Sequence, residues 1–283
     1  MQSSATVKQG WLRVVLFLIA YLLLIFFSNN LLAVMTVSLF NSTDSMNLFY
    51  TGICINFFIS IVLVFFFRKT FDRKSFKSLG FEWSGFGKER TGGFFTGILL
   101  TTVIATVLWL MQLLQWFITD VDAAGLLIVF ALLMLVAIFE ELVFRGYLLN
   151  NLMESLPKEA ALFVSALLFA AFHLLNPDFN LIAFINIFIA GVLLGINYIY
   201  TKNLWFAIFF HFSWNFFQGP VLGFQVSGIE LPTLLQQNSN GSILLTGGKF
   251  GLEASWLVTI AMSLTVLILY FIFQKKYNTP TVD

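Results

Sequence analysis

Long apolar runs separated by short polar breaks extend along most of the 283-residue chain. A transmembrane α-helix needs about 20 consecutive, mainly apolar residues to cross the hydrocarbon core of a bilayer. The pattern predicts eight such helices, at residues 11–28, 46–67, 93–118, 124–149, 159–176, 181–200, 203–218 and 255–274. We therefore expect an all-α fold: a polytopic transmembrane helical bundle of about eight spanning helices that forms a single domain over residues 1–283.

The first apolar run and its flanks also fit a signal peptide, because Lys8 and Arg13 supply a positive N-terminal region. The run is long, however, and no small-residue cleavage site follows it, so we interpret it as a retained helix. The boundaries within residues 159–218 are the least well defined, since only short polar breaks near residues 177 and 202 divide the apolar sequence.

The distribution of basic residues predicts the orientation, because cytoplasmic loops carry the excess of Lys and Arg. With the N-terminus inside, all 15 Lys and Arg residues except Arg145, within a span, and Lys249, in an outside loop, lie in inside segments. Both termini are therefore predicted to be cytoplasmic. Residues 68–92 form a basic cytoplasmic loop, which is either a positive-inside anchor or a docking surface for anionic lipid or substrate. Residues 219–254 form the longest external loop.

Composition agrees with a membrane protein. Hydrophobic residues make up 59% of the chain and charged residues 10%, against about 25% charged residues in soluble domains. A surface this apolar requires the lipid bilayer as its surroundings. The net charge of +1 gives no sign of a nucleic-acid partner, and the single cysteine excludes an intramolecular disulfide. Oligomeric state has no sequence signature here.

Away from the span ends, five charged or histidine side chains lie within the predicted spans. Each costs roughly 2.5–3.5 kcal/mol on membrane-insertion scales, so such residues are functional candidates by default. The five are Glu140, Glu141, Arg145, His173 and His211. They include both histidines of the chain and three charges within six residues of one span. This concentration of buried polar groups indicates a chemical site.

Helical geometry separates the two adjacent glutamates. Glu141 and Arg145 are four residues apart and share one helix face, whereas Glu140 is rotated by about 100° from Glu141. Glu141 and Arg145 are therefore expected to form a structural ion pair that leaves Glu140 free to act as a general base. In the alternative interpretation, both acids satisfy Arg145, or the group lies at the membrane interface and is solvated.

The seventh predicted span carries a second pair of polar residues on one face. His211 and Asn215 are four residues apart and can point at the same spot. A neutral histidine accepts a proton, orients water or binds a metal, and an asparagine amide donates to a developing oxyanion. A lone histidine on an apolar face is more often a satisfied core residue, and that alternative applies to His173 and His211 taken singly.

Three sequence blocks resemble the signature of a known family. They are Glu-Glu-x-x-x-Arg at 140–145, Phe-x-x-x-His at 169–173 and His-x-x-x-Asn at 211–215, in this order and each on its own predicted helix. This set resembles the CAAX-protease and bacteriocin-processing family (CPBP or Abi), which includes type II CAAX prenyl proteases. The motif-bearing core covers about residues 125–220, and the stretches after Asn215 and before Glu253 also look like bacterial members.

The resemblance implies an intramembrane endopeptidase, and it assigns roles to the site residues. Glu140 would activate the attacking water with help from His173, and His211 with Asn215 would stabilise the oxyanion. Glu141 and Arg145 would support the site. The family is often labelled a metalloprotease, and zinc bound by Glu140, His173 and His211 is the alternative to the metal-free reaction that we expect here, since no His-Glu-x-x-His helix is present.

The expected partners are a peptide or protein substrate at the membrane and the lipid bilayer itself. We expect an integral protein of a bacterial plasma membrane whose active site lies toward the cytoplasmic half. Helix lengths place His173 and Glu140 at poorly matched depths, unless the fifth helix begins in the cytoplasm near Pro157 or tilts. A non-catalytic relative that acts in bacteriocin immunity or as a membrane scaffold is the first alternative, and a transporter is the second.

Overall fold

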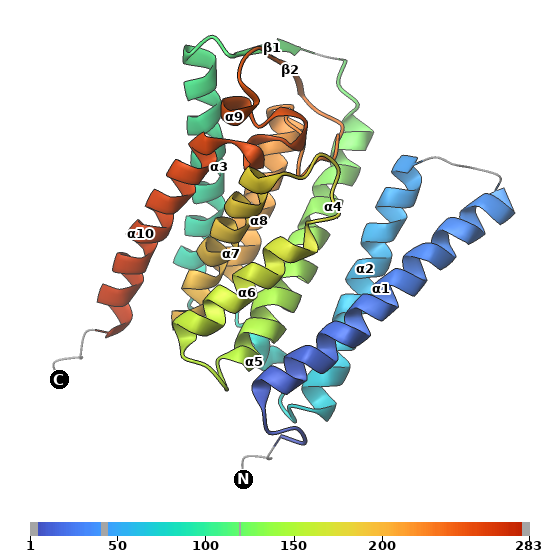
Figure 1. Ribbon diagram of the computed structural model, residues 1–283, viewed down its shortest axis with the longest axis vertical. Helices are drawn as coiled ribbons and strands as arrows, with labels where there is room; N and C mark the ends of the chain where they lie inside the picture. Colours follow the sequence, from blue (N-terminus) through green and yellow to red (C-terminus); the bar gives the residue numbers. More distant parts are fainter. Residues whose placement is uncertain (1–4, 41–44, 119, 279–283) are drawn as a thin grey trace.

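The computed structural model describes residues 5–40, 45–118 and 120–278, and the described chain is mostly helical (Figure 1). The helices are α1 (Gly10–Phe40), α2 (Ser45–Thr70), α3 (Gly87–Leu110), α4 (Ala123–Glu141), α5 (Asn150–Leu152), α6 (Lys158–Phe172), α7 (Leu181–Thr201), α8 (Trp205–Phe216), α9 (Ile243–Thr246) and α10 (Trp256–Asn278). The π-helical segment Leu142–Leu149 joins α4 to α5, and a second one, Phe217–Val221, extends α8.

Within the described residues, six helices are long and apolar enough to cross a membrane. They correspond to predicted spans one to four, six and eight, and the fourth runs without interruption from Ala123 to Leu152. The predicted spans 159–176 and 203–218 form α6 and α8, which have only 15 and 12 residues. Because a perpendicular span needs about 20 residues, the predicted count of eight is not confirmed. The six long helices nevertheless make this an integral membrane protein.

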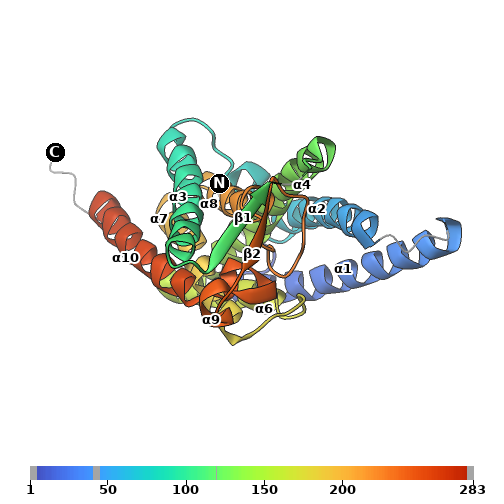
Figure 2. The same cartoon turned by 90° about the horizontal axis from the view of Figure 1, so that it is seen from above.

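The predicted third span ends too late. Helix α3 stops at Leu110, and residues Leu114–Ile118 form strand β1, which pairs antiparallel with β2 (Leu235–Ser239) from the predicted external loop. Gln112 turns the chain with a positive φ of 60°. The apolar run continues through this turn, so hydropathy alone could not separate the strand from the helix. Figure 2 shows the two strands lying across one end of the bundle.

Helices α4, α6, α7 and α8 lie together, with α3 and α10 on one side of them and α1 and α2 on the other (Figure 1). The packing of α3 on α8 depends on glycines four residues apart. A Cβ atom on Gly93 would lie 2.3 Å from the carbonyl oxygen of Phe206, and one on Gly97 would lie 2.2 Å from Ser213 Oγ. Small residues at this spacing let two helix backbones approach closely within a membrane.

The basic segments gather at one end of the bundle. The first turn of α1, the last turns of α2 and α10, and the connection from α7 to α8 all lie at the lower end of Figure 1. This arrangement has the topology that the charge count requires, while the direction of the bundle in the membrane stays a prediction. Helix α6 begins directly after Pro157 and runs obliquely to α4 in Figure 1.

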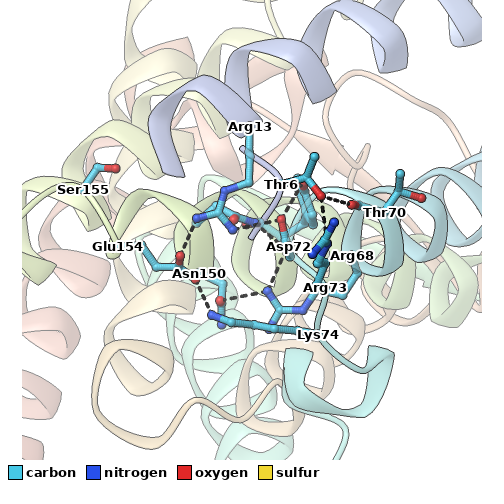
Figure 3. A network of polar contacts seen from close by, with 12 residues as sticks. Thr6, Arg13, Arg68, Thr70, Asp72, Arg73, Lys74, Asn150, Glu154 and Ser155 are labelled. Carbon is cyan, nitrogen blue, oxygen red and sulfur yellow. Dashed lines mark hydrogen bonds and ion pairs between the residues drawn. The ribbon is translucent and has the colours of Figure 1, made fainter. Parts of the chain in front are cut away.

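A buried ionic cluster joins three chain segments at this end (Figure 3). Asp72 accepts hydrogen bonds from Arg13 at 3.0 Å and from Arg68 at 2.8 Å, and all three side chains are at most 2% exposed. Arg13 also pairs with Glu154, which binds Lys74 at 2.6 Å. Burial raises the pKa of Glu154, but hydrogen bonds from Lys74 and Arg13 outweigh it and hold this pKa below its usual value. Arg68, at the start of the predicted basic loop, is thus a structural residue.

Candidate active site

The two adjacent glutamates end α4, directly before the π-helical segment. Glu141 is fully buried, whereas the side chain of Glu140 is 19% exposed. The two carboxylates thus meet different surroundings, as the rotation of about 100° between neighbouring residues predicts. π-Helical turns inside α-helices occur frequently at functional sites, because the extra residue re-aims the side chains around it.

Glu141 and Arg145 form the predicted ion pair. Arg145 donates to Glu141 Oε1 at 2.9 Å, and both side chains are fully buried. The guanidinium also donates to the carbonyl oxygen of Gly191 at 3.0 Å and lies 4.3 Å from the ring centroid of Phe169. These contacts tie α4 and the π-helical segment to α6 and α7. Arg145 is therefore a structural centre that fixes the helices around the site.

His211 bridges the two glutamates. Its Nδ1 lies 3.0 Å from Glu141 Oε1, and its Nε2 lies 3.9 Å from Glu140 Oε2. The carboxylate of Glu141 is paired with Arg145 and accepts, so Nδ1 of His211 is the donor. This bond directs Nε2 toward Glu140. Sequence reasoning assigned Glu141 to Arg145 alone and missed its contact with His211, because no local pattern relates residues that are 70 positions apart.

His173 caps the C-terminal end of α6. Its Nδ1 lies 2.8 Å from the carbonyl oxygen of Phe169, and a carbonyl only accepts, so Nδ1 carries the proton. In the neutral ring, Nε2 then has a free lone pair. The Phe169 ring lies 4.8 Å from the His173 ring and 6.2 Å from the His211 ring. Phe169 thus supports both histidines and Arg145, which gives the Phe-x-x-x-His block a physical role.

Glu140, His173, His211 and Asn215 line one cavity of about 370 Å³. Three helices bring these side chains together: α4 carries Glu140, His173 directly follows α6, and α8 carries His211 and Asn215. Most of the remaining lining is apolar or aromatic. The candidate residues predicted from separate spans therefore share one site.

The cavity extends further than the sequence indicates. Tyr21 from α1 and Asn56 from α2 line it, as do Ser227 and Glu253 from the predicted external loop. No sequence signal marked these residues as part of a site, since they lie outside the motif-bearing core. The side from which the cavity opens stays a prediction.

The side chains of the described residues that could act as zinc ligands do not lie close enough together to bind a metal ion. Within residues 5–40, 45–118 and 120–278, no three His, Cys, Asp or Glu side chains converge closely enough to hold a metal ion. The alternative ligand set of Glu140, His173 and His211 therefore does not fit a zinc site in this arrangement. Glu141 also occupies one ring nitrogen of His211.

The fold and cavity define a polytopic α-helical membrane protein with a buried site of two glutamates, two histidines and an asparagine. Residues 122–217 match the family model described as "Type II CAAX prenyl endopeptidase Rce1-like". The matched segment contains all three sequence blocks, and it confirms the predicted relationship to the CAAX-protease family. No curated protein and no solved structure matches the chain.

Proposed function

We propose that the chain is an intramembrane endopeptidase that hydrolyses a peptide bond in a membrane-associated protein or peptide. The observation that carries this proposal is the meeting of Glu140, His173, His211 and Asn215 in one largely apolar cavity. Hydrolysis needs a base, a positioned water and an oxyanion donor, and these four side chains supply the three roles. The family match supports an enzyme of the CAAX-protease type and does not favour a transporter or an immunity protein.

In the proposed reaction, Glu140 accepts a proton from a water molecule while the water oxygen attacks the scissile carbonyl carbon. The free Nε2 of His173 accepts a hydrogen bond from the same water and orients it. The carbonyl π electrons move onto the carbonyl oxygen and produce a tetrahedral oxyanion. When this intermediate collapses, the C–N bond breaks and Glu140 passes its proton to the leaving nitrogen. General-base catalysis of this kind contributes typically 10²–10⁴-fold.

The oxyanion is bound by His211 and Asn215. Since Nδ1 of His211 donates to Glu141, a second donor at Nε2 requires the doubly protonated ring. With His211 charged, the negative charges of Glu140 and Glu141 offset the positive charges of His211 and Arg145. The cluster of these four side chains is then neutral overall. This balance avoids an uncompensated charge, which is costly in a low-dielectric interior. The amide of Asn215, which is 6% exposed, supplies the second donor.

The test uses purified protein in lipid vesicles with a library of apolar peptides, and mass spectrometry of the products. The wild type is expected to cleave some of the peptides, and Glu140→Gln is expected to lower that rate by about 10²–10⁴-fold. The matched control is Glu82→Gln, because the side chain of Glu82 is 53% exposed on a surface loop. Equal rates for the wild type and Glu140→Gln would contradict the mechanism. Activity that chelation removes and zinc restores would contradict the metal-free proposal.

A further inference from the structure

Glu253 is a buried carboxylate that the proposed reaction does not use. It lies in a short 3₁₀ turn, Leu252–Ala254, directly before α10, and it is 8% exposed. The side chain lines the same cavity as Glu140 and His173. A titratable group in this position faces whatever occupies the cavity.

The surrounding contacts fix the Glu253 side chain and its backbone. The backbone N–H and the hydroxyl of Ser227 donate to Glu253 Oε2 at 2.7 and 2.9 Å. Asn186 on α7 donates to the carbonyl oxygens of Glu253 and Ser255, each at 2.8 Å. Thr259 in turn donates to Asn186 Oδ1 at 2.6 Å. The carboxylate is thus preorganised on two helices and a loop, as a binding group should be.

With His173 neutral, as in the proposed reaction, the charge of Glu253 has no counter-charge among the described residues. Among the described residues that line the cavity there is no Lys or Arg, and the ion pairs of the described chain do not include Glu253. Burial raises the pKa of Glu253 above its usual value, and the hydrogen bonds from Ser227 only partly offset this shift. A buried carboxylate without a counter-charge is costly, and a cation that enters the cavity offsets this cost.

We propose that Glu253 is a specificity-determining residue that binds a cationic group of the substrate, a Lys or Arg side chain, close to the scissile bond. This inference rests on the proposed function and names a chemical feature of its substrate. The apolar and aromatic lining of the cavity binds the hydrophobic side chains of the substrate, and its few polar groups fix the position of the substrate along the cavity. A site built around a buried charge rejects an analogue that lacks the matching group.

The test compares two sets of peptides in vesicles, each an apolar sequence of about 20 residues. One set carries a single Lys at successive positions, and the other carries Met there. Binding is measured with Glu140→Gln protein, which is expected to bind without turnover, with and without Glu253→Gln. At one or two positions, Lys peptides are expected to bind about tenfold or more tightly than Met peptides. Glu253→Gln is expected to bring this ratio close to one.

The control variant is Glu230→Gln, which removes an exposed carboxylate from the same loop and leaves the ratio unchanged. A ratio that persists in Glu253→Gln, or the absence of any Lys preference with Glu253 intact, overturns the proposal. The second criterion needs no Glu253 variant, so it holds even if Glu253→Gln does not fold.

Cleavage assays separate the two proposals. Wild-type protein that binds Lys peptides selectively but cleaves no peptide supports the cationic subsite and contradicts the protease function. Protein that cleaves Lys and Met peptides with equal kcat/KM supports the protease and overturns the subsite. Glu253→Asp keeps the charge and is expected to retain part of the preference. An equal loss of kcat/KM for both peptides in Glu253→Gln indicates a merely structural role and overturns the proposal.

Discussion

Two neighbouring glycines of α3 give a prediction in which one substitution stabilises the fold and the other destabilises it. A Cβ atom on Gly93 would lie 2.3 Å from the carbonyl oxygen of Phe206 and 3.0 Å from its carbonyl carbon. These are backbone atoms of α8, so no rotamer change relieves the clash and the helices must separate. A Cβ atom on Gly92 meets nothing within 4 Å.

The magnitudes follow from two opposing effects. Alanine in a helix interior is favoured over glycine by about 0.5–1 kcal/mol, and both variants gain this amount. Overpacking of a close contact typically costs about 1–3 kcal/mol, and only Gly93→Ala incurs it. We therefore expect Gly92→Ala to stabilise the protein by about 0.5–1 kcal/mol. Gly93→Ala is expected to destabilise it by up to about 2 kcal/mol.

The assay is equilibrium unfolding in mixed detergent micelles with increasing dodecyl sulfate, followed by tryptophan fluorescence. The seven tryptophans of the chain provide the signal. The two substitutions lie at adjacent positions of the same helix. Each variant is therefore the control for the expression, purification and assay of the other. A Gly93→Ala protein as stable as Gly92→Ala would refute the close approach of α3 and α8.

Three further variants test the ionic cluster and the site. Asp72→Asn removes the carboxylate that two buried guanidinium groups share. It is expected to lower the free energy of unfolding by about 3–5 kcal/mol in the same assay, against little change for Glu82→Gln. Above pH 4.5, Glu154→Gln is expected to unfold at a lower temperature than the wild type. In acid this difference is expected to vanish, because the wild-type carboxyl protonates as the pH falls through its lowered pKa. Glu141→Gln is expected to reduce kcat, because His211 loses its charged acceptor. Wild-type kcat in folded Glu141→Gln would contradict this role.

Local periodicity predicted part of the site correctly. The spacing of Glu141 and Arg145 implied a shared face, and the rotation between consecutive residues implied that Glu140 points elsewhere; both expectations are confirmed. These features depend on helix geometry within a few residues, which the sequence contains directly. The catalytic roles of these residues remain proposals.

Features that depend on contacts between distant segments were beyond the sequence. Glu141 meets His211 across 70 positions, and Glu253 lines the cavity from the loop that the sequence predicts to be external. The predicted count of eight spans is not confirmed, because α6 and α8 are apolar yet shorter than a membrane-spanning helix needs to be. A high apolar content indicates that a segment is buried, but it does not show whether lipid or protein surrounds the segment.

In the proposed mechanism, Glu140 drives peptide-bond hydrolysis in the membrane. The most direct measurement compares protein termini, by mass spectrometry, in cells that carry the wild type with those in cells that carry Glu140→Gln at equal abundance. This substitution preserves the shape of the side chain and removes the base. A set of internal termini is expected to vanish in the variant, and those peptides identify the substrate. Unchanged termini with a folded, abundant variant would contradict catalysis by Glu140 and favour a non-catalytic role.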